Sequence, residues 1–290
     1  MHRAVRWYWR MAIAIGMAMG SMPGIGAEEL QGTLQLKGSD TMVNLCQAWA
    51  EAFRAKHPKM TVAVTGGGSG SGLAALISGT CDLAASSRTM SEKELGLARA
   101  HGEQPEEWKV ALDGIAVVVH PSNPVKQLTI EQLAHLFNGT IRNWKELGGA
   151  DALVVLLSRE VNSGTHVYFK EHVFKALTDH GAAEFAPEAL LMPSSQAIAD
   201  EVASNQAAVG YYGMGYLNPK NAAVAITKTS AEPSIVPTEE TIRSGAYPIS
   251  RPLFFYSPGV PRGAVKAFLD FVMSPEGQAL VRTIDFIPVN

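Results

Sequence analysis

The chain has 290 residues, of which 47% are hydrophobic and 18% are charged, and its formal net charge is -3. This length allows two domains or one large one, and this composition is ordinary for a globular protein with a sizeable core. The small negative charge excludes the broad basic face of a nucleic-acid-binding protein.

The first 27 residues form a separate segment, which we expect to be a secretory signal peptide. Three arginines and no acid precede an apolar run from Met11 to Met22, and Pro23 with small residues follows it. A basic start, a short apolar core and a small-residue cleavage zone are typical of such signals. An N-terminal membrane anchor is the alternative, but the apolar run is too short to span a bilayer. We therefore predict an exported chain, cleaved after Gly26 or Ala27.

Short apolar strands alternate with helices after this segment. Strands are predicted at 33–36, 60–65 and 82–85, with helices at 41–56 and 71–77 between them. In the first helix Leu45, Trp49 and Phe53 share one face. This β-α-β-α-β order favours a mostly parallel sheet that helices cover on both faces.

A second α/β unit follows Leu112. Its strands are predicted from Ile115 to Val119 and at 152–160, 207–213 and 246–257, and its helices at 129–137, 162–177 and 194–206. A further helix is predicted at 90–102, and two helices separated at Ser274-Pro275 end the chain. These last helices have no sheet nearby, so we expect residues from about Leu253 to rejoin the first unit. Two lobes joined by two crossing strands would leave a cleft between them.

The sequence contains two cysteines, Cys46 and Cys81. The oxidising surroundings of an exported protein would allow them to form a disulfide, and two unpaired buried thiols are the alternative. No histidine lies at ligand spacing from either cysteine, so we expect no metal site there.

Three loops share one design. Each follows a predicted strand, combines glycine with serine or threonine, and leads into a helix: "KGSDTM", "GGGSGSG" and "SREVNSGTH". Open α/β sheets bind ligands beyond the carboxyl ends of their strands, where helix N-termini present free N–H groups. Glycine lets the backbone approach an anion, and hydroxyls add donors. These loops, one of which contains Arg159, predict a small-anion site, and three capped helices with nothing bound are the alternative.

Motifs of other ligand classes fit less well. Gly70, Gly72 and Ala75 match the spacing of a dinucleotide fingerprint, but the next strand ends in Ser87-Arg88 rather than in the acid that would hold the ribose. The sequence has no P-loop, no serine nucleophile elbow and no paired-histidine zinc motif. A role for His166 in binding remains an alternative, because this residue lies next to one of the three loops.

The order and spacing of these motifs resemble the periplasmic phosphate-binding proteins of phosphate ABC transporters. The resemblance covers nearly the whole chain after the signal segment and includes "GSDTM", "GGGSGSG", "CDLAASSR", "SREVNSGTHVYF" and "AYPISRPLFFY". It implies the two-lobed type II periplasmic-binding-protein fold, in which each lobe is a mixed, mostly parallel sheet flanked by helices and two crossing strands form the hinge. We assign residues 28–113 and 253–290 to lobe 1 and residues 114–252 to lobe 2.

The family holds a dehydrated phosphate between its lobes with hydroxyls, backbone N–H groups and one arginine. By resemblance, these roles fall to nine residues of this sequence: Ser39, Thr41, Met42 through its N–H, Ser69, Ser87, Arg159, Ser163, Gly164 and Thr165. Ser87 stands where several family members have an aspartate that accepts the proton of phosphate. A carboxylate accepts only and therefore repels sulfate, whereas a hydroxyl can also donate, which leaves the selectivity open. Asp40 and Glu160 are the other candidate acceptors.

The resemblance implies a periplasmic binding protein that delivers inorganic phosphate to the membrane permease of an ABC transporter. We expect a monomer with no cofactor, no metal, no nucleic-acid partner and no catalytic residue. The nearest alternative is a binder of another tetrahedral oxyanion, such as sulfate or molybdate. A secreted enzyme acting on phosphate esters is a further alternative, which would need a nucleophile with a base or a metal cluster.

Overall fold

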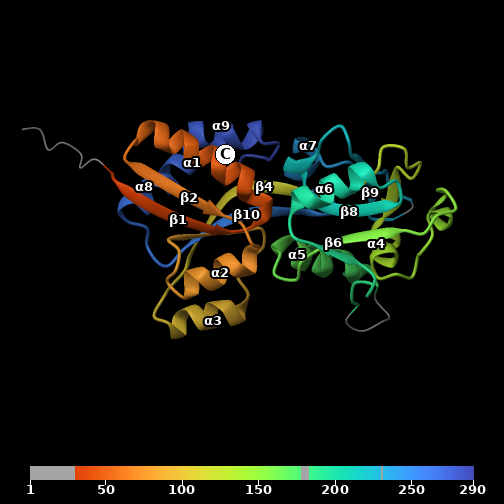
Figure 1. Ribbon diagram of the computed structural model, residues 1–290, viewed down its shortest axis with the longest axis horizontal. Helices are drawn as coiled ribbons and strands as arrows, with labels where there is room; N and C mark the ends of the chain where they lie inside the picture. The colour runs from red at the N-terminus through yellow and green to blue at the C-terminus, as the bar shows by residue number, and fades with distance from the viewer. Residues whose placement is uncertain (1–29, 178–182, 230) are drawn as a thin grey trace, which may run out of the picture.

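The computed structural model describes residues 30–177, 183–229 and 231–290, and the predicted signal peptide lies outside them. The described residues form two α/β lobes, side by side along the longest axis of the molecule (Figure 1). Over these residues, no helix is long and apolar enough to cross a membrane. The mixed two-lobed α/β architecture that the sequence predicts is confirmed.

Lobe 1 is built on five strands in the order β2-β1-β3-β10-β4. Their bounds are β1 (Gly32–Gly38), β2 (Met60–Thr65), β3 (Leu83–Ser86), β4 (Glu106–Val119) and β10 (Ser250–Ser257). β1 pairs in parallel with β2 and β3, whereas β10 runs antiparallel to β3 and β4. The carboxyl ends of the three parallel strands therefore meet at one edge of the sheet.

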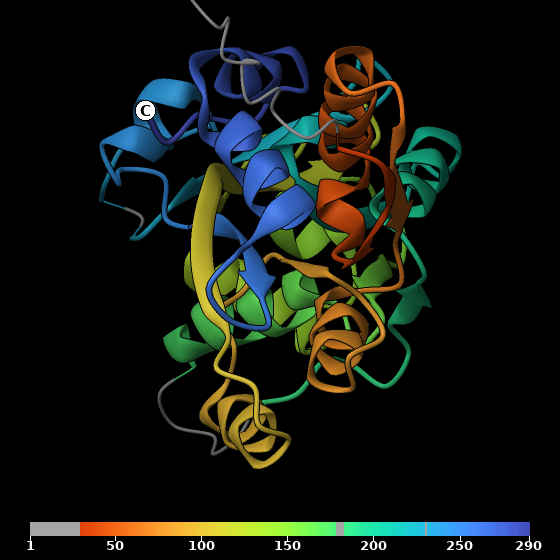
Figure 2. The same ribbon diagram turned by 90° about the vertical axis from the view of Figure 1, so that its left-hand side faces the viewer.

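Helices cover both faces of this sheet (Figure 2). One face carries α1 (Val43–Lys56), α8 (Gly263–Met273) and α9 (Pro275–Thr283), and the other carries α2 (Ser69–Ile77) and α3 (Glu92–Ala100). Trp49 and Phe53 of α1 pack in one core with Phe268 of α8, because the apolar residues of α1 recur at helical spacing. The Trp49 indole also donates to the carbonyl of Gly277 at 2.7 Å. The last two helices are thus part of lobe 1.

Lobe 2 extends from the second half of β4. β8 (Ala208–Gly213) runs antiparallel to β4 and parallel to β6 (Val155–Arg159), which pairs with β7 (Leu190–Met192). β9 (Ala222–Thr227) also pairs with β4, and β5 (Gln127–Thr129) pairs with β9. The helices of this lobe are α4 (Ile130–Phe137), α5 (Gly164–Val173), α6 (Ser195–Ser204) and α7 (Glu239–Arg243). Short 3-10 turns lie at Asp40–Met42 in lobe 1 and at Trp144–Leu147, Phe174–Ala176 and Met214–Tyr216 in lobe 2.

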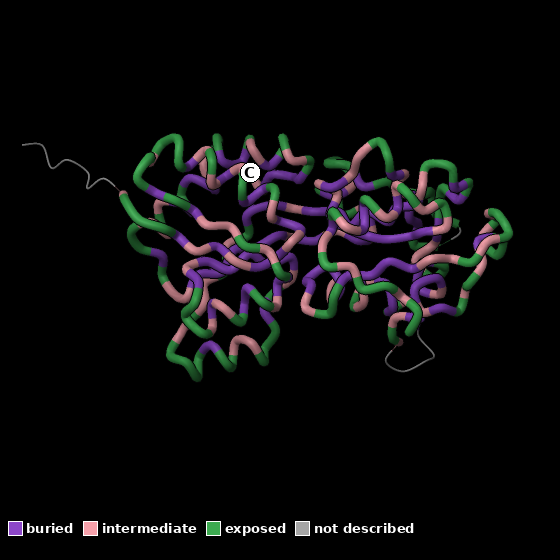
Figure 3. Tube along the Cα trace, in the orientation of Figure 1, coloured by how far each residue is buried: buried purple, intermediate pink, exposed green. Residues whose placement is uncertain are grey.

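β4 and β10 connect the two lobes. The first part of β4 pairs with β10, and its last five residues, Ile115 to Val119, pair with β8. Most residues of these strands are buried where the chain passes from one lobe to the other (Figure 3). The strands that join the lobes are therefore part of both cores.

Most predicted elements are confirmed, with differences at their ends. Thr129 caps α4 through a capping box, and Ser274 with Pro275 separates the two final helices, both as predicted. α2 begins at Ser69, two residues before the predicted start. The sequence analysis missed β5, β7, β9 and α7. Three of these have only three to five residues, which is too short for a periodic pattern.

Cys46 and Cys81 are free thiols in the structure, which contradicts the disulfide interpretation. Cys46 lies in the core beneath α1, whereas Cys81 lies in the core beneath α2, on the opposite face of the sheet. The sheet between the two cores keeps the sulfur atoms apart. Burial raises the pKa of both thiols, that of Cys81 to about 11, so both stay protonated near neutral pH.

Candidate functional site

The loops after β1, β2, β3 and β6 meet where the two lobes face each other. All nine residues predicted to bind the anion lie in or beside these loops and are buried: Ser39, Thr41, Met42, Ser69, Ser87, Arg159, Ser163, Gly164 and Thr165. Side chains with hydrogen-bonding groups are rarely buried in such numbers without a partner or a ligand. We call these nine residues the anion cage.

Two threonines connect the lobes inside the anion cage. Thr41 of lobe 1 lies just before α1, and Thr165 of lobe 2 lies in the first turn of α5. Their Oγ1 atoms are 2.8 Å apart, and both residues are at most 1% exposed. A ligand oxygen placed here would replace this hydroxyl–hydroxyl bond with two bonds to itself.

Ser69, Ser87 and Gly164 form the adjoining part of the anion cage. The Ser87 N–H donates to Ser69 Oγ at 3.0 Å, and the two serine Oγ atoms are 3.3 Å apart. Gly164 of lobe 2 lies against both serines, since an added Cβ would overlap Ser69 Oγ and lie 2.7 Å from Ser87 Oγ. Only glycine allows this approach of α5 to lobe 1.

The glycine-rich loop also receives a segment of lobe 2. Asn162 donates through Nδ2 to the carbonyl of Gly67 at 2.9 Å, and its own carbonyl accepts from the N–H of Gly70 at 2.9 Å. Gly68 has φ +89°, and a Cβ there would lie 2.9 Å from the Asn162 carbonyl oxygen. Part of the glycine content thus serves contact between the lobes, in addition to any contact with a ligand.

Arg159 reaches across the cleft to Asp40. Its Nη2 donates to Asp40 Oδ2 at 2.8 Å and to the carbonyl of Pro193 at 3.0 Å. Nε donates to the carbonyl of Met192 at 3.2 Å, and Nη1 donates to Ser195 Oγ at 3.2 Å. Among the described residues these bonds take four of the five N–H groups, which leaves one Nη1 hydrogen for a ligand.

The other predicted residues have more local partners. Ser163 caps α5 by accepting from the N–H groups of Thr165 and His166. The Met42 N–H, predicted to face the anion, donates to the carbonyl of Ser39 at 3.1 Å within a 3-10 turn. Of the two alternative acceptors, Glu160 is exposed, whereas the carboxylate of Asp40 is 13% exposed and bonded to Arg159.

Arg251 is a second arginine in contact with the anion cage, and the sequence analysis missed it. From β10, its Nη1 donates to the carbonyl of Ser87 at 3.0 Å, and its Nη2 donates to Thr165 Oγ1 at 2.9 Å. It forms a fully buried ion pair with Asp113 of β4. The resemblance assigns one arginine to the anion, and Arg251 is a second arginine that contacts residues of the anion cage. A signal existed in the sequence, because Asp113 is the one charge between Val110 and Val119, and Arg251 is the one charge between Ser250 and Ser257.

Burial acts on both members of this ion pair. It raises the pKa of the Asp113 carboxyl and lowers that of Arg251, and each charge opposes the shift of the other. An arginine keeps its proton under such conditions, and the three N–H groups that donate to the Asp113 oxygens favour the charged form of that carboxyl.

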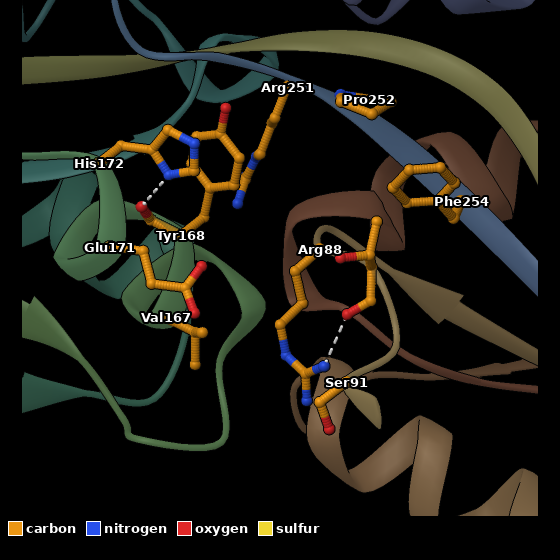
Figure 4. A pocket seen from close by; sticks show the side chains of 10 residues that line it. Arg88, Ser91, Val167, Tyr168, Glu171, His172, Arg251, Pro252 and Phe254 are labelled. Carbon is orange, nitrogen blue, oxygen red and sulfur yellow. Dashed lines mark hydrogen bonds between the residues drawn. The ribbon is translucent and has the colours of Figure 1, made fainter. Parts of the chain in front are cut away.

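A cavity of about 370 Å³ lies between the lobes beside the anion cage (Figure 4). Arg88 and Phe254 line it from lobe 1, and Tyr168, Glu171 and His172 line it from α5. Arg251 lies at its inner wall, with its guanidinium carbon 5.7 Å from the centre of the Tyr168 ring. The cavity therefore reaches Arg251, which contacts the anion cage.

The ring of His166 bonds to a group outside the anion cage. Its Nδ1 lies 3.2 Å from Ser158 Oγ, which in turn bonds to the Tyr211 hydroxyl at 2.8 Å. Burial lowers the pKa of His166 below its usual value of 6.5, so the ring is neutral near pH 7. The described residues contain no group of three or more His, Cys, Asp or Glu that could hold a metal ion.

Comparisons with known proteins show the family of the chain. Residues 26–276 match the family model described as the PBP superfamily domain. The phosphate-binding protein PstS of Pseudomonas aeruginosa is 32% identical over 280 residues, which cover 91% of this chain and 85% of that protein. PstS of Bacillus subtilis is 32% identical over 266 residues, which cover 91% of this chain and 83% of that protein.

Solved structures give the same assignment. A structure from Clostridium perfringens, assigned as a phosphate ABC transporter substrate-binding protein with bound phosphate, superposes with a TM-score of 0.80 at 31% identity. That match covers 89% of this chain and 100% of the other. An ABC-type phosphate transport receptor from Vibrio cholerae gives a TM-score of 0.68 at 30% identity, with coverage of 89% and 100%. The chain therefore belongs to the PBP superfamily and, within it, to the family of phosphate-binding proteins that includes PstS.

Proposed function

We propose that this protein binds inorganic phosphate in the anion cage and delivers it to the permease of an ABC transporter. One observation carries the proposal: buried hydroxyls from both lobes, Thr41, Ser69, Ser87 and Thr165, meet where the lobes face each other, and Arg159 bonds to Asp40 next to Thr41. Such a set of neutral donors and one cationic group suits a small dehydrated oxyanion. The names of the relatives, which include phosphate-binding and phosphate-transport proteins, support the same ligand.

In this proposal binding requires the two lobes to close on the ion. Lobe 1 contributes Ser39, Thr41, Ser69 and Ser87, and lobe 2 contributes Arg159, Ser163, Gly164 and Thr165. Because neither lobe holds the full set, the ion would be held only when α5 approaches the glycine-rich loop. β4 and β10 would act as the hinge, with residues 28–113 and 253–290 moving as one lobe and 114–252 as the other.

We also propose that the protein acts in the periplasm as a monomer, after removal of residues 1–27. The N-terminal sequence pattern supports export. The transporter membership of the related structures supports a permease partner. The role is binding without catalysis.

Calorimetric titration of phosphate-depleted protein tests the proposed ligand. We expect tight one-to-one binding of phosphate and weaker binding of sulfate, arsenate and molybdate. Release of phosphate from an ester substrate should stay at the level of the buffer. Tight binding of sulfate or molybdate with none of phosphate would refute the proposed ligand, and turnover of the ester would refute a binding role.

The hydroxyl of Ser87 favours a second candidate function, the binding of several oxyanions with less selectivity for phosphate. We expect Ser87→Asp to sharpen the preference for phosphate over sulfate, mainly by weakening sulfate, because a carboxylate accepts the proton of monohydrogen phosphate and repels an anion without one. Competitive displacement of labelled phosphate by sulfate, at fixed pH and salt, measures the ratio for wild type and variant. Ser78→Asp, at an exposed position after α2, is a control for the added charge. An unchanged ratio in the folded Ser87 variant would mean that this residue does not set the selectivity.

A further inference from the structure

Arg251 is held in one orientation by the strands that join the lobes. It lies opposite Asp113 in the antiparallel pair of β10 and β4, and both side chains are 0% exposed. Asp113 Oδ2 accepts from Nε at 3.0 Å and from Nη2 at 2.9 Å, while Oδ1 accepts from the N–H of Met214 at 3.0 Å. Two bonds to one carboxylate oxygen and a third bond on the other oxygen fix the plane of the guanidinium.

The remaining bonds of Arg251 go to both lobes of the anion cage. Nη1 donates to the Ser87 carbonyl in lobe 1, and Nη2 donates to Thr165 Oγ1 in lobe 2. Tyr168 and Pro252 flank the side chain on the cavity side (Figure 4). Arg251 therefore touches the end of β3 and the start of α5 at the same time.

The bond to Thr165 decides what that hydroxyl can do. A hydroxyl has one proton and two lone pairs, whereas a guanidinium can only donate. Because Thr165 Oγ1 accepts from Arg251 through one lone pair, its proton is available to Thr41 Oγ1, 2.8 Å away, or to a ligand placed between them. An arginine donor also polarises the hydroxyl and makes it a stronger donor. A strong, oriented donor is what a dehydrated oxyanion requires.

We propose that Arg251 is a positioning residue of the phosphate site, which orients the Thr165 hydroxyl as a donor to the anion and is itself held by Asp113. The inference rests on the proposed function, since it concerns the same anion cage. The family resemblance assigns Arg159 to the site. The proposal adds Arg251, which acts through Thr165.

A double-mutant cycle in phosphate affinity tests this role. Arg251→Lys keeps the charge, but a single ammonium cannot satisfy Asp113, Ser87 and Thr165 together. We expect about a thirtyfold loss of affinity for Arg251→Lys and for Thr165→Val, each equivalent to about one charge-assisted hydrogen bond. We expect the double variant to bind about as weakly as Thr165→Val alone, because the second change removes the group through which the first acts.

Two controls separate positioning from a general effect of structure. Arg251→Lys combined with Ser39→Ala should show additive losses, since Ser39 does not contact Arg251 in the structure. Arg88→Lys should bind phosphate like wild type, because this arginine lines the same cavity but pairs with Glu94. If Arg251→Lys does not fold, Asp113→Asn takes its place in the cycle, because it weakens the hold on Arg251 without changing the shape of the residue.

The outcomes of the cycle differ from those of the ligand titration. Losses that multiply in the Arg251→Lys and Thr165→Val double variant would overturn the positioning role and leave phosphate binding intact. Wild-type affinity of a folded Arg251→Lys protein would overturn it as well. Failure of the wild-type protein to bind phosphate would instead refute the proposed function.

Discussion

Replacing Arg159 by alanine is expected to weaken phosphate binding by about a hundredfold or more. The change removes one N–H available to the anion, and a hydrogen bond to a charged group contributes about 1.5–3 kcal/mol, or about tenfold to more than a hundredfold in affinity. It also leaves the Asp40 carboxylate, now 2.8 Å from Arg159, without its counter-charge beside the anion. Repulsion between this carboxylate and a dianion adds to the loss.

Titration of the folded variant with phosphate measures this effect, with circular dichroism as the check on folding. Arg142→Ala is the matched control, since Arg142 lies in the same lobe, is 70% exposed and pairs with Glu188 at 3.5 Å. We expect the control to bind like wild type. An Arg159→Ala protein that titrates like wild type would mean that the anion lies elsewhere.

Replacing Gly164 by alanine is expected to lower phosphate affinity by at least about tenfold, the factor that 1.4 kcal/mol of strain produces. The new Cβ would overlap Ser69 Oγ and lie 2.7 Å from Ser87 Oγ, so α5 would have to withdraw from lobe 1. Inserting one methyl group into a packed site typically costs about 1–3 kcal/mol of free energy, because the neighbouring groups must move.

Calorimetry measures this affinity, and small-angle X-ray scattering with and without phosphate measures closure. Gly96→Ala in α3 is the control, because a Cβ at Gly96 would meet nothing within 4 Å. Wild-type affinity of the Gly164 variant, with an unchanged difference in scattering, would show that α5 does not approach the serines this closely in the bound state.

The order of strands and helices could be predicted from the sequence because local patterns carry it. Short apolar runs located β1, β2 and β6, and Thr129 and the Ser274-Pro275 break located the starts of α4 and α9. The three loops that combine glycine with hydroxyls were identified in the same way, since turns and helix starts have local signals. β9 could have been predicted as well, because five of its six residues, "AAVAIT", form an apolar run.

Contacts between distant residues could not be predicted in this way. The sequence left the pairing of Cys46 and Cys81 open, and the two thiols proved to lie in different cores because a sheet separates α1 from α2. Arg159 and Asp40 are 119 residues apart in the sequence, and only the contact between the two lobes brings them together.

The sequence by itself determined the alternation of elements, the three anion-type loops and the family, because these depend on local pattern and on the order of motifs. The tertiary structure alone decided which groups meet in the anion cage. Arg251 and Asp113 are 138 residues apart, and each is locally one charge beside an apolar run. Burial of one charge without the other would be costly, so the two strands must pair in this register, and that register places Arg251 against Ser87 and Thr165.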